Sequence, residues 1–155
     1  MRARLALVLP VLLLAPLTAR AQDLMEESKL PDQAARDVFK GIATGVEKDE
    51  RAAFVKLVAP AGLKLYKKKV TRAELTKQLE KATVGAVTRL DENCQEKAGG
   101  KCKQWGPWRT SPGKNAKEFQ VTIGSGYGEL PTATVQKQGA SWFITAITKV
   151  DHGAP

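Results

Sequence analysis

Apolar residues repeat at helical spacing soon after residue 30. Between residues 35 and 46 they fall on one face of a helix. Pro31 and Asp32 stand just before this stretch, where a proline and an acid favour the start of a helix. The charged segment 47–50 interrupts the pattern, and a shorter apolar side follows over residues 53–58. We therefore predict one long helix followed by one short helix.

Residues 63–93 carry a second set of local signals. The segment 63–70 (LKLYKKKV) begins with apolar residues and lysines in alternation, which predicts a short strand or an extended arm. Thr71 and Glu74 have the spacing of a capping box, so we expect a third helix that runs to about Ala82. Beyond it the apolar period shortens toward two, which predicts a strand over residues 84–93.

The remainder of the chain is typical of strands and turns. Residues 101–109 are the expected hairpin partner of the strand just described, and residues 110–116 (TSPGKNA) have the composition of a loop. Alternation over residues 119–123 predicts a half-buried strand. A closing hairpin is predicted from residues 132–137 and 141–150, around a turn that contains a glycine.

Three predicted helices thus precede four to five predicted antiparallel strands. Grouped helices and strands imply an α+β domain whose helices pack on one face of a curved sheet. This order resembles the NTF2-like superfamily, the cone-shaped fold of ketosteroid isomerase-like proteins. The resemblance rests on the first helix (DQAARDVFKGIATGV), the third helix (TRAELTKQLEKA) and the closing hairpin (TATVQKQGASWFITAI). It implies a single domain over residues 31–150; a cystatin-like α+β topology is the alternative.

The N-terminal residues 1–21 have the features of a signal peptide. Arginines precede an apolar run over residues 5–17, and Ala19 and Ala21 supply the small residues that a signal peptidase reads. The run is shorter than the roughly 20 residues that a membrane-spanning helix needs. We therefore predict cleavage after Ala21, a periplasmic or secreted location, and no stable membrane insertion of the mature chain.

The ends of the mature chain are expected to lie outside the domain. Residues 22–30 are polar and acidic and read as a disordered leader, and residues 151–155 read as a tail. Between them stand two cysteines, Cys94 and Cys102. An even number of cysteines in an exported chain predicts a disulfide, here closing a hairpin loop. A metal site would need further ligands, and a redox motif would place two residues between the cysteines.

The chain is basic, with a formal net charge of +9. Its densest basic cluster consists of Lys64, Lys67, Lys68, Lys69 and Arg72. Such a cluster is either a solvated surface or a patch that binds anionic envelope polymers. The sequence contains no nucleic-acid recognition motif, so we expect no nucleic-acid partner.

Few side chains suit catalysis. His152 is the one histidine and is expected to be a solvated tail residue, so the chain lacks the base that a serine or cysteine nucleophile needs. We therefore predict no catalytic residues, no metal site and no cofactor.

A carboxylate mechanism is the remaining catalytic alternative. A buried acid beside a tyrosine can move a proton next to a carbonyl, which is the chemistry that the ketosteroid isomerase-like resemblance implies. The candidate acids are Asp91, Glu92 and Glu118. The first two are neighbours, so on a strand they would point to opposite faces.

Aromatic residues are the better sequence signal for a ligand. Exposed tryptophans often mark binding surfaces, although they can also seal the end of a core. Along the last strand Trp142 and Ile144 would share one face, and Phe143 and Ile147 the other. The candidate ligand-binding residues are Tyr66, Trp105, Trp108, Tyr127 and Trp142.

The sequence therefore favours an exported, non-catalytic binding domain whose ligand is an unknown small molecule or an envelope protein. One alternative is a carboxylate-dependent isomerase or hydrolase. The other is a basic module that binds anionic envelope polymers. Exposed strand faces also make a homodimer possible.

Overall fold

The computed structural model describes residues 29–124 and 126–153. The predicted signal peptide and nearly all of the predicted leader lie outside these residues. The described elements, in chain order, are α2 (Gln33–Glu47), α3 (Arg51–Leu57), β1 (Leu63–Leu65), β2 (Lys68–Val70), α4 (Arg72–Leu79), α5 (Val84–Thr88), the 3-10 helix η1 (Leu90–Asn93), β3 (Glu96–Ala98), β4 (Lys101–Gln104), β5 (Trp108–Pro112), β6 (Glu118–Ile123), β7 (Glu129–Gln138) and β8 (Ser141–Asp151).

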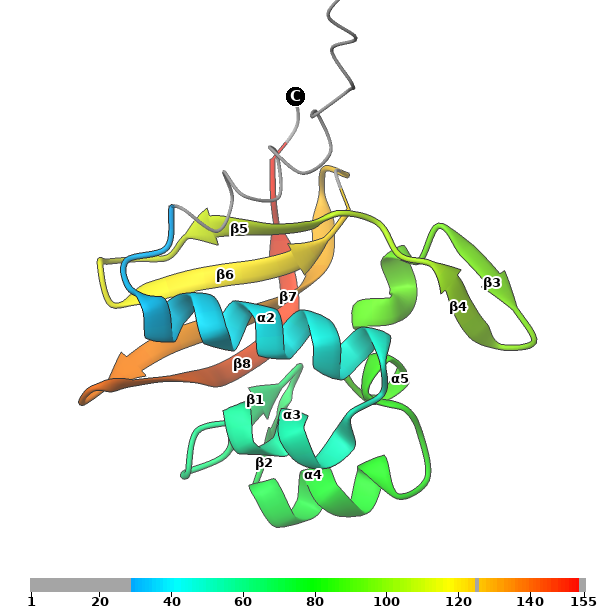
Figure 1. Ribbon diagram of the computed structural model, residues 1–155, viewed down its shortest axis with the longest axis horizontal. Helices are drawn as coiled ribbons and strands as arrows, with labels where there is room; N and C mark the ends of the chain where they lie inside the picture. Colours follow the sequence, from blue (N-terminus) through cyan, green and yellow to red (C-terminus); the bar gives the residue numbers. More distant parts are fainter. Residues whose placement is uncertain (1–28, 125, 154–155) are drawn as a thin grey trace, which may run out of the picture.

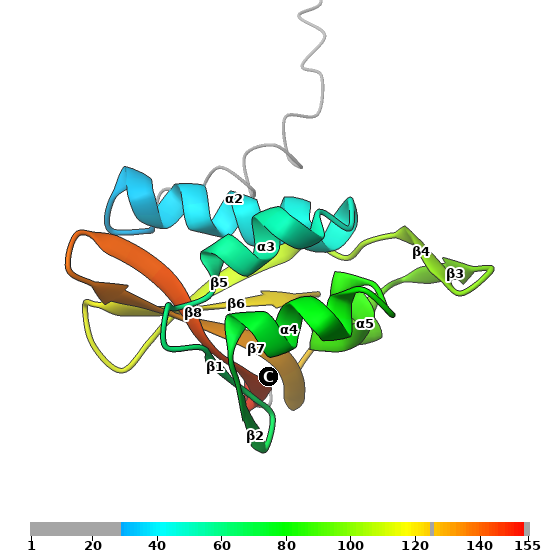
Figure 2. The same ribbon diagram turned by 90° about the horizontal axis from the view of Figure 1, so that it is seen from below.

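Six strands form one sheet in the order β2-β1-β8-β7-β6-β5 (Figure 1). Helices α2 and α3 lie over one face of this sheet (Figure 2). The α+β class is confirmed, but the prediction of a wholly antiparallel sheet of four to five strands is wrong. The sheet is mixed, because β1 pairs in parallel with β8 while the other neighbouring strands are antiparallel.

The helices begin where the sequence places their caps. The carboxylate of Asp32 accepts a hydrogen bond from the backbone N–H of Ala35 at 2.8 Å, which satisfies one of the free donors at the start of α2. The predicted capping box of α4 is present, with Thr71 and Glu74 each bonding the other's backbone N–H. Leu30, at the end of the predicted disordered leader, is instead buried in the core.

A bulge in β8 changes which residues face the core. Thr134 pairs with Ala146 but its neighbour Val135 pairs with Ile144, so Thr145 is the extra residue. Trp142 and Ile144 share the buried face, as predicted. Ile147 was predicted on the opposite face, but it is buried as well, because the extra residue shifts the alternation by one.

The prediction of a strand over residues 84–93 is wrong. Thr83 caps α5 by accepting a hydrogen bond from the backbone N–H of Ala86, and Arg89 ends this helix in a left-handed conformation (φ 58°). The chain then turns into η1. Asp91 and Glu92 lie in this 3-10 helix and not on opposite faces of a strand.

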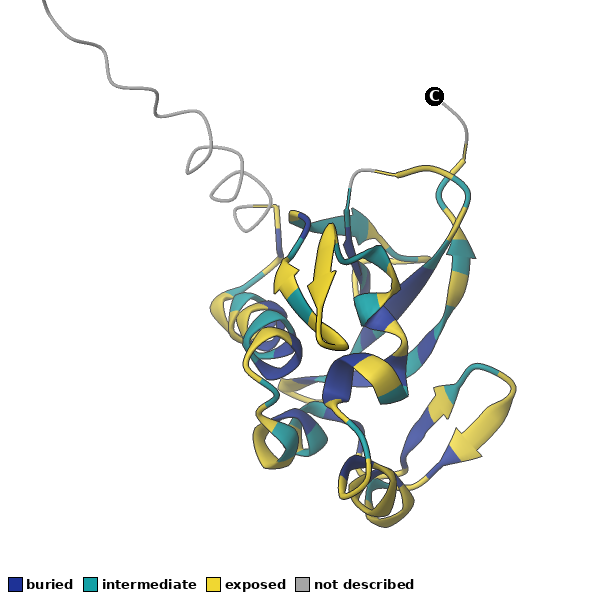
Figure 3. Ribbon diagram, turned by 90° about the vertical axis from the view of Figure 1, so that its right-hand side faces the viewer, coloured by how far each residue is buried: buried dark blue, intermediate teal, exposed yellow. Residues whose placement is uncertain are grey.

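The predicted hairpin around the cysteines is shorter than expected. Cys94 and Cys102 form a disulfide, and β4 pairs with β3 across the turn between them. This small hairpin projects from the body of the molecule (Figure 1), and most of its residues are exposed (Figure 3). Residues 108–109 were predicted to belong to the hairpin partner, and residues 110–112 to a loop. In the structure residues 108–112 form one strand, β5, which pairs with β6.

The space between helices and sheet is filled by apolar side chains from both layers. The largest fully buried ones include Phe54 on α3, Leu75 on α4 and Ile144 on β8. Among the described residues, no helix is long and apolar enough to cross a membrane.

Candidate anion-binding grooves

The hairpin β1–β2 carries most of the predicted basic cluster. Its register places Lys64 directly opposite Lys69 and Leu65 opposite Lys68. All three lysines are exposed. Like charges opposite one another destabilise a strand pair, so this hairpin keeps an unfavourable arrangement of charge.

An open groove of about 670 Å³ lies beside this hairpin. Three chain segments meet there: the hairpin itself, the end of α5 and the C-terminal half of β8. Five of the lining residues are cations, and none is an acid. The lining residues are Lys64, Leu65, Tyr66, Lys67, Lys68, Arg89, Thr148 and Lys149.

Tyr66 fixes the geometry of this first groove. Its backbone is left-handed (φ 55°), an uncommon conformation for a bulky residue. Its hydroxyl donates a hydrogen bond to the carbonyl oxygen of Thr88 at 2.8 Å, and the guanidinium of Arg89 lies 4.8 Å from its ring centroid. Burial raises the pKa of Tyr66 to about 12, so the phenol stays neutral at physiological pH. The ring thus joins the hairpin turn to α5.

The cations of the first groove are only partly balanced. Arg89 forms an ion pair with Glu92, and Lys149 lies 3.6 Å from the other carboxylate oxygen of the same residue. One carboxylate is therefore shared by two cations. Lys64, Lys67 and Lys68 add further positive charge at the mouth.

A second open groove, of about 480 Å³, lies next to the first. The two grooves share Lys64 and Lys67, and again no acid is among the lining residues. Amide and hydroxyl side chains from β7 and β8 form one side. The lining residues are Ala59, Ala61, Gly62, Leu63, Lys64, Lys67, Lys69, Gln136, Gln138 and Thr145.

Arg72 lines neither groove, although the sequence grouped it with these lysines. Its guanidinium donates hydrogen bonds to the carbonyl oxygens of Val58 and Lys56. It also lies 6.0 Å from the ring centroid of Phe143. Arg72 therefore ties α4 to the end of α3 and contributes to the fold.

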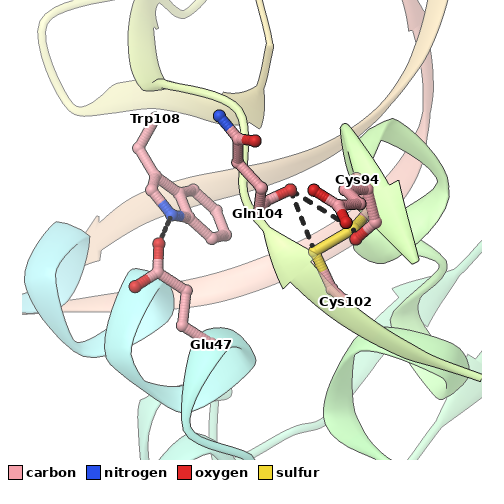
Figure 4. Close-up of a disulfide and its surroundings, with 6 residues drawn as sticks. Glu47, Cys94, Cys102, Gln104 and Trp108 are labelled. Carbon is pink, nitrogen blue, oxygen red and sulfur yellow. Dashed lines mark hydrogen bonds between the residues drawn. A yellow bond between two sulfur atoms is a disulfide. The ribbon is translucent and has the colours of Figure 1, made fainter. Parts of the chain in front are cut away.

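The tryptophans are not gathered around Tyr66. Trp142 is 3% exposed and its indole N–H donates to the carboxylate of Asp32, so it belongs to the core. Trp105 and Trp108 are half-buried and pack against the core. The indole of Trp108 donates to Glu47 at 2.6 Å, close to the disulfide (Figure 4). Tyr127 is 57% exposed, on the turn after β6.

Glu118 is the most buried of the three candidate acids. It accepts hydrogen bonds from the side chain of Gln136 and the backbone N–H of Lys114. The bond from Gln136 is the main cause that lowers the pKa of Glu118. A general acid at neutral pH needs a raised pKa, so this environment favours an ionised, structural carboxylate. No cluster of three or more metal-ligating side chains occurs within the described ranges.

His152 is not the solvated tail residue expected from the sequence. It is half-buried, and its Nε2 atom lies 2.8 Å from the hydroxyl of Thr132. Burial and the positive charge of Arg109 lower its pKa below the ordinary 6.5. Asp151, also assigned to the tail, is the last residue of β8.

We expect acidification to destabilise the fold through His152. A lowered folded-state pKa means that the unfolded chain takes up the proton first, so stability falls as the pH drops below about 6.5. In thermal unfolding between about pH 7 and pH 5.5, the His152→Gln variant should lose part of this decline. An equal decline in both proteins would contradict the assigned environment of the ring.

Comparison with known proteins assigns no function to this chain. No protein-family model matches this chain, and no curated protein matches it. The chain is similar to an NTF2-like protein. That protein comes from Novosphingobium aromaticivorans and is described as having a cystatin-like fold. Its sequence is 13% identical to this chain, and the match covers 90% of each chain with a TM-score of 0.44.

Sequence reasoning found part of the grooves. It singled out Tyr66 and the lysines of the hairpin, but it missed Arg89 and Lys149. Arg89 was expected within a strand, and Lys149 carried no local signal. The parallel pairing of β1 with β8 brings Lys149 beside the hairpin, and the contacts of Tyr66 with Thr88 and Arg89 add the end of α5.

Proposed function

We propose that this chain is an exported, non-catalytic binding domain whose ligand is an anion held at the basic grooves. The observation that carries the proposal is the first groove, where cations from three separate segments converge and no acid lines the surface. Such a surface attracts anions and raises their local concentration. The Cys94–Cys102 disulfide is consistent with export, because such bonds persist in oxidising compartments.

Binding is favoured over the carboxylate-dependent isomerase or hydrolase. That mechanism needs a pocket holding an acid whose pKa is raised. The layers between helices and sheet are packed with apolar side chains, and the pKa of Glu118 is lowered. The hydroxyl of Tyr66, the tyrosine at the groove, donates a hydrogen bond to a backbone carbonyl and stays neutral.

Charge reversal in the first groove should abolish most anion binding. We expect the double variant Lys67→Glu, Lys68→Glu to weaken the binding of inorganic pyrophosphate at least about tenfold, because repulsion replaces attraction within the groove. Titration calorimetry of the mature chain at low salt measures this. The matched control is Lys101→Glu, Lys103→Glu on the disulfide hairpin, which changes the net charge equally and should alter affinity less than about twofold.

Two outcomes would overturn the proposal. If both double variants weaken binding equally, the affinity reflects net charge alone and the groove is not the site. If the unaltered chain binds no pyrophosphate at millimolar concentration, the chain has no anion site of this kind. Turnover of a lactone, enone or epoxide that Asp91→Asn abolishes would instead establish the carboxylate enzyme.

A further inference from the structure

The two basic grooves meet at one hairpin, which separates them along β2. Lys64 and Lys67 line both grooves. Lys68 lines only the first groove and Lys69 only the second. Successive residues of a strand point to opposite faces, which explains why these neighbours serve different grooves. Positive charge therefore continues from one side of the hairpin to the other.

We propose that the ligand is a linear polyanion that lies across both grooves and contacts lysines on each side of the hairpin. This inference rests on the proposed anion-binding function and names the class of ligand. A small anion fills one groove and leaves the cations of the other unpaired. A chain with repeated phosphate or carboxylate groups reaches both.

The hairpin itself supports a ligand with several charges. Lys64 and Lys69 are directly opposed, at a separation of about 5 Å between Cβ atoms. Both side chains line the second groove, because directly opposed residues share one face. The pair costs stability in the free protein, and a negative group bound in that groove would relieve the repulsion. The amide of Gln138 in the second groove adds hydrogen-bond donors for the oxygens of the polymer, whereas the amide of Gln136 already donates to Glu118.

A soluble polymer fits these grooves better than a lipid surface. Proteins that bind the membrane interface usually insert apolar side chains beside their cations. Among the described residues, the exposed large hydrophobic side chain is Tyr127, which lies on the turn after β6 and lines neither groove.

The neighbouring lysines of β2 provide a matched test. Lys68→Ala and Lys69→Ala each remove one exposed charge from the same strand, on different sides of the hairpin. We expect each variant to weaken binding of long-chain polyphosphate about three- to tenfold. Each should also reduce the slope of log affinity against log salt by roughly 0.7, the amount that corresponds to neutralising one charge fewer on a single-stranded polyanion. Lys97→Ala, on the disulfide hairpin, is the control and should change neither quantity.

A short probe separates the polymer inference from the proposed function. Inorganic pyrophosphate should bind the mature chain more weakly than long-chain polyphosphate at equal phosphate concentration, and should respond to only one of the two lysine variants. Polyglutamate of similar length tests whether carboxylates replace phosphates. Vesicles rich in anionic lipid test the membrane alternative.

The results divide clearly. If pyrophosphate does not bind at millimolar concentration, the proposed function fails, and the polymer inference, which rests on it, fails with it. If pyrophosphate binds but one lysine variant leaves long-chain binding unchanged, the anion site stands and the polymer inference is wrong. Binding to anionic vesicles without binding to any polymer would also overturn the inference, whereas losses in both lysine variants with both long polymers would establish it.

Discussion

Replacing Gly62 by alanine should lower the free energy of unfolding by about 2–5 kcal/mol. Gly62 precedes β1 with φ +90°, and an added Cβ atom would lie 2.3 Å from the carbonyl oxygen of Val70 on the partner strand. A left-handed backbone costs a residue with a Cβ about 1–2 kcal/mol, and a clash that displaces backbone costs about 1–3 kcal/mol more. Chemical unfolding of Gly62→Ala measures the loss.

The matched control is Gly139→Ala in the turn between β7 and β8. Gly139 also has a positive φ (+63°), but a Cβ atom there would meet nothing within 4 Å. We expect this variant to lose only the conformational part, about 1–2 kcal/mol. Equal losses of stability in the two variants would contradict the close approach of the Gly62 backbone to Val70 in β2. Because Gly62 also lines the second groove, its variant should weaken polyanion binding as well.

The elements with strong local signals could be predicted from the sequence. The helix after Asp32 has both a cap and a continuous apolar face, and the helix after Thr71 has a capping box. The closing hairpin has alternating residues around a glycine turn. In each case the residues that decide the structure lie within a few positions of one another.

The remaining elements depend on contacts that the local pattern does not contain. The segment 84–88 is rich in β-branched residues, yet it is helical because Thr83 caps it and its apolar side packs into the core. The bulge at Thr145 is a property of the pairing between β7 and β8. The segment LKLYKKKV folds back on itself because Tyr66 adopts a left-handed turn, and it then adds to the edge of β8.

The same limit applies to the candidate site. A run of lysines is visible in the sequence, but its neighbours in space are not. Arg72 is close to these lysines in sequence, but its guanidinium bonds the backbone of Val58 and stabilises the fold. Arg89 and Lys149 are distant from the lysines in sequence, yet they line the first groove. The aromatic residues show the same limit, because burial decides whether a tryptophan belongs to the core or to the surface, and the local sequence does not contain it.

Trp142→Ala should be among the most destabilising substitutions, with a reduction of about 3–5 kcal/mol in the free energy of unfolding. The indole is almost completely buried, packs 5.4 Å from the ring of Phe119 between centroids, and donates its N–H to Asp32. The truncation therefore leaves a cavity and removes a partner of the residue that caps α2. Urea unfolding followed by circular dichroism measures the reduction.

Trp108→Ala distinguishes a core role from a ligand-binding role for the tryptophans. Trp108 is half-buried and its indole bonds Glu47 at the end of α2, so truncation should cost clearly less than at Trp142. Both variants, while folded, should keep the polyphosphate affinity of the unaltered chain, because neither residue lines the basic grooves. A folded Trp108→Ala protein that no longer binds polyphosphate would place the ligand at the aromatic end of the sheet and remove the lysine hairpin from the site.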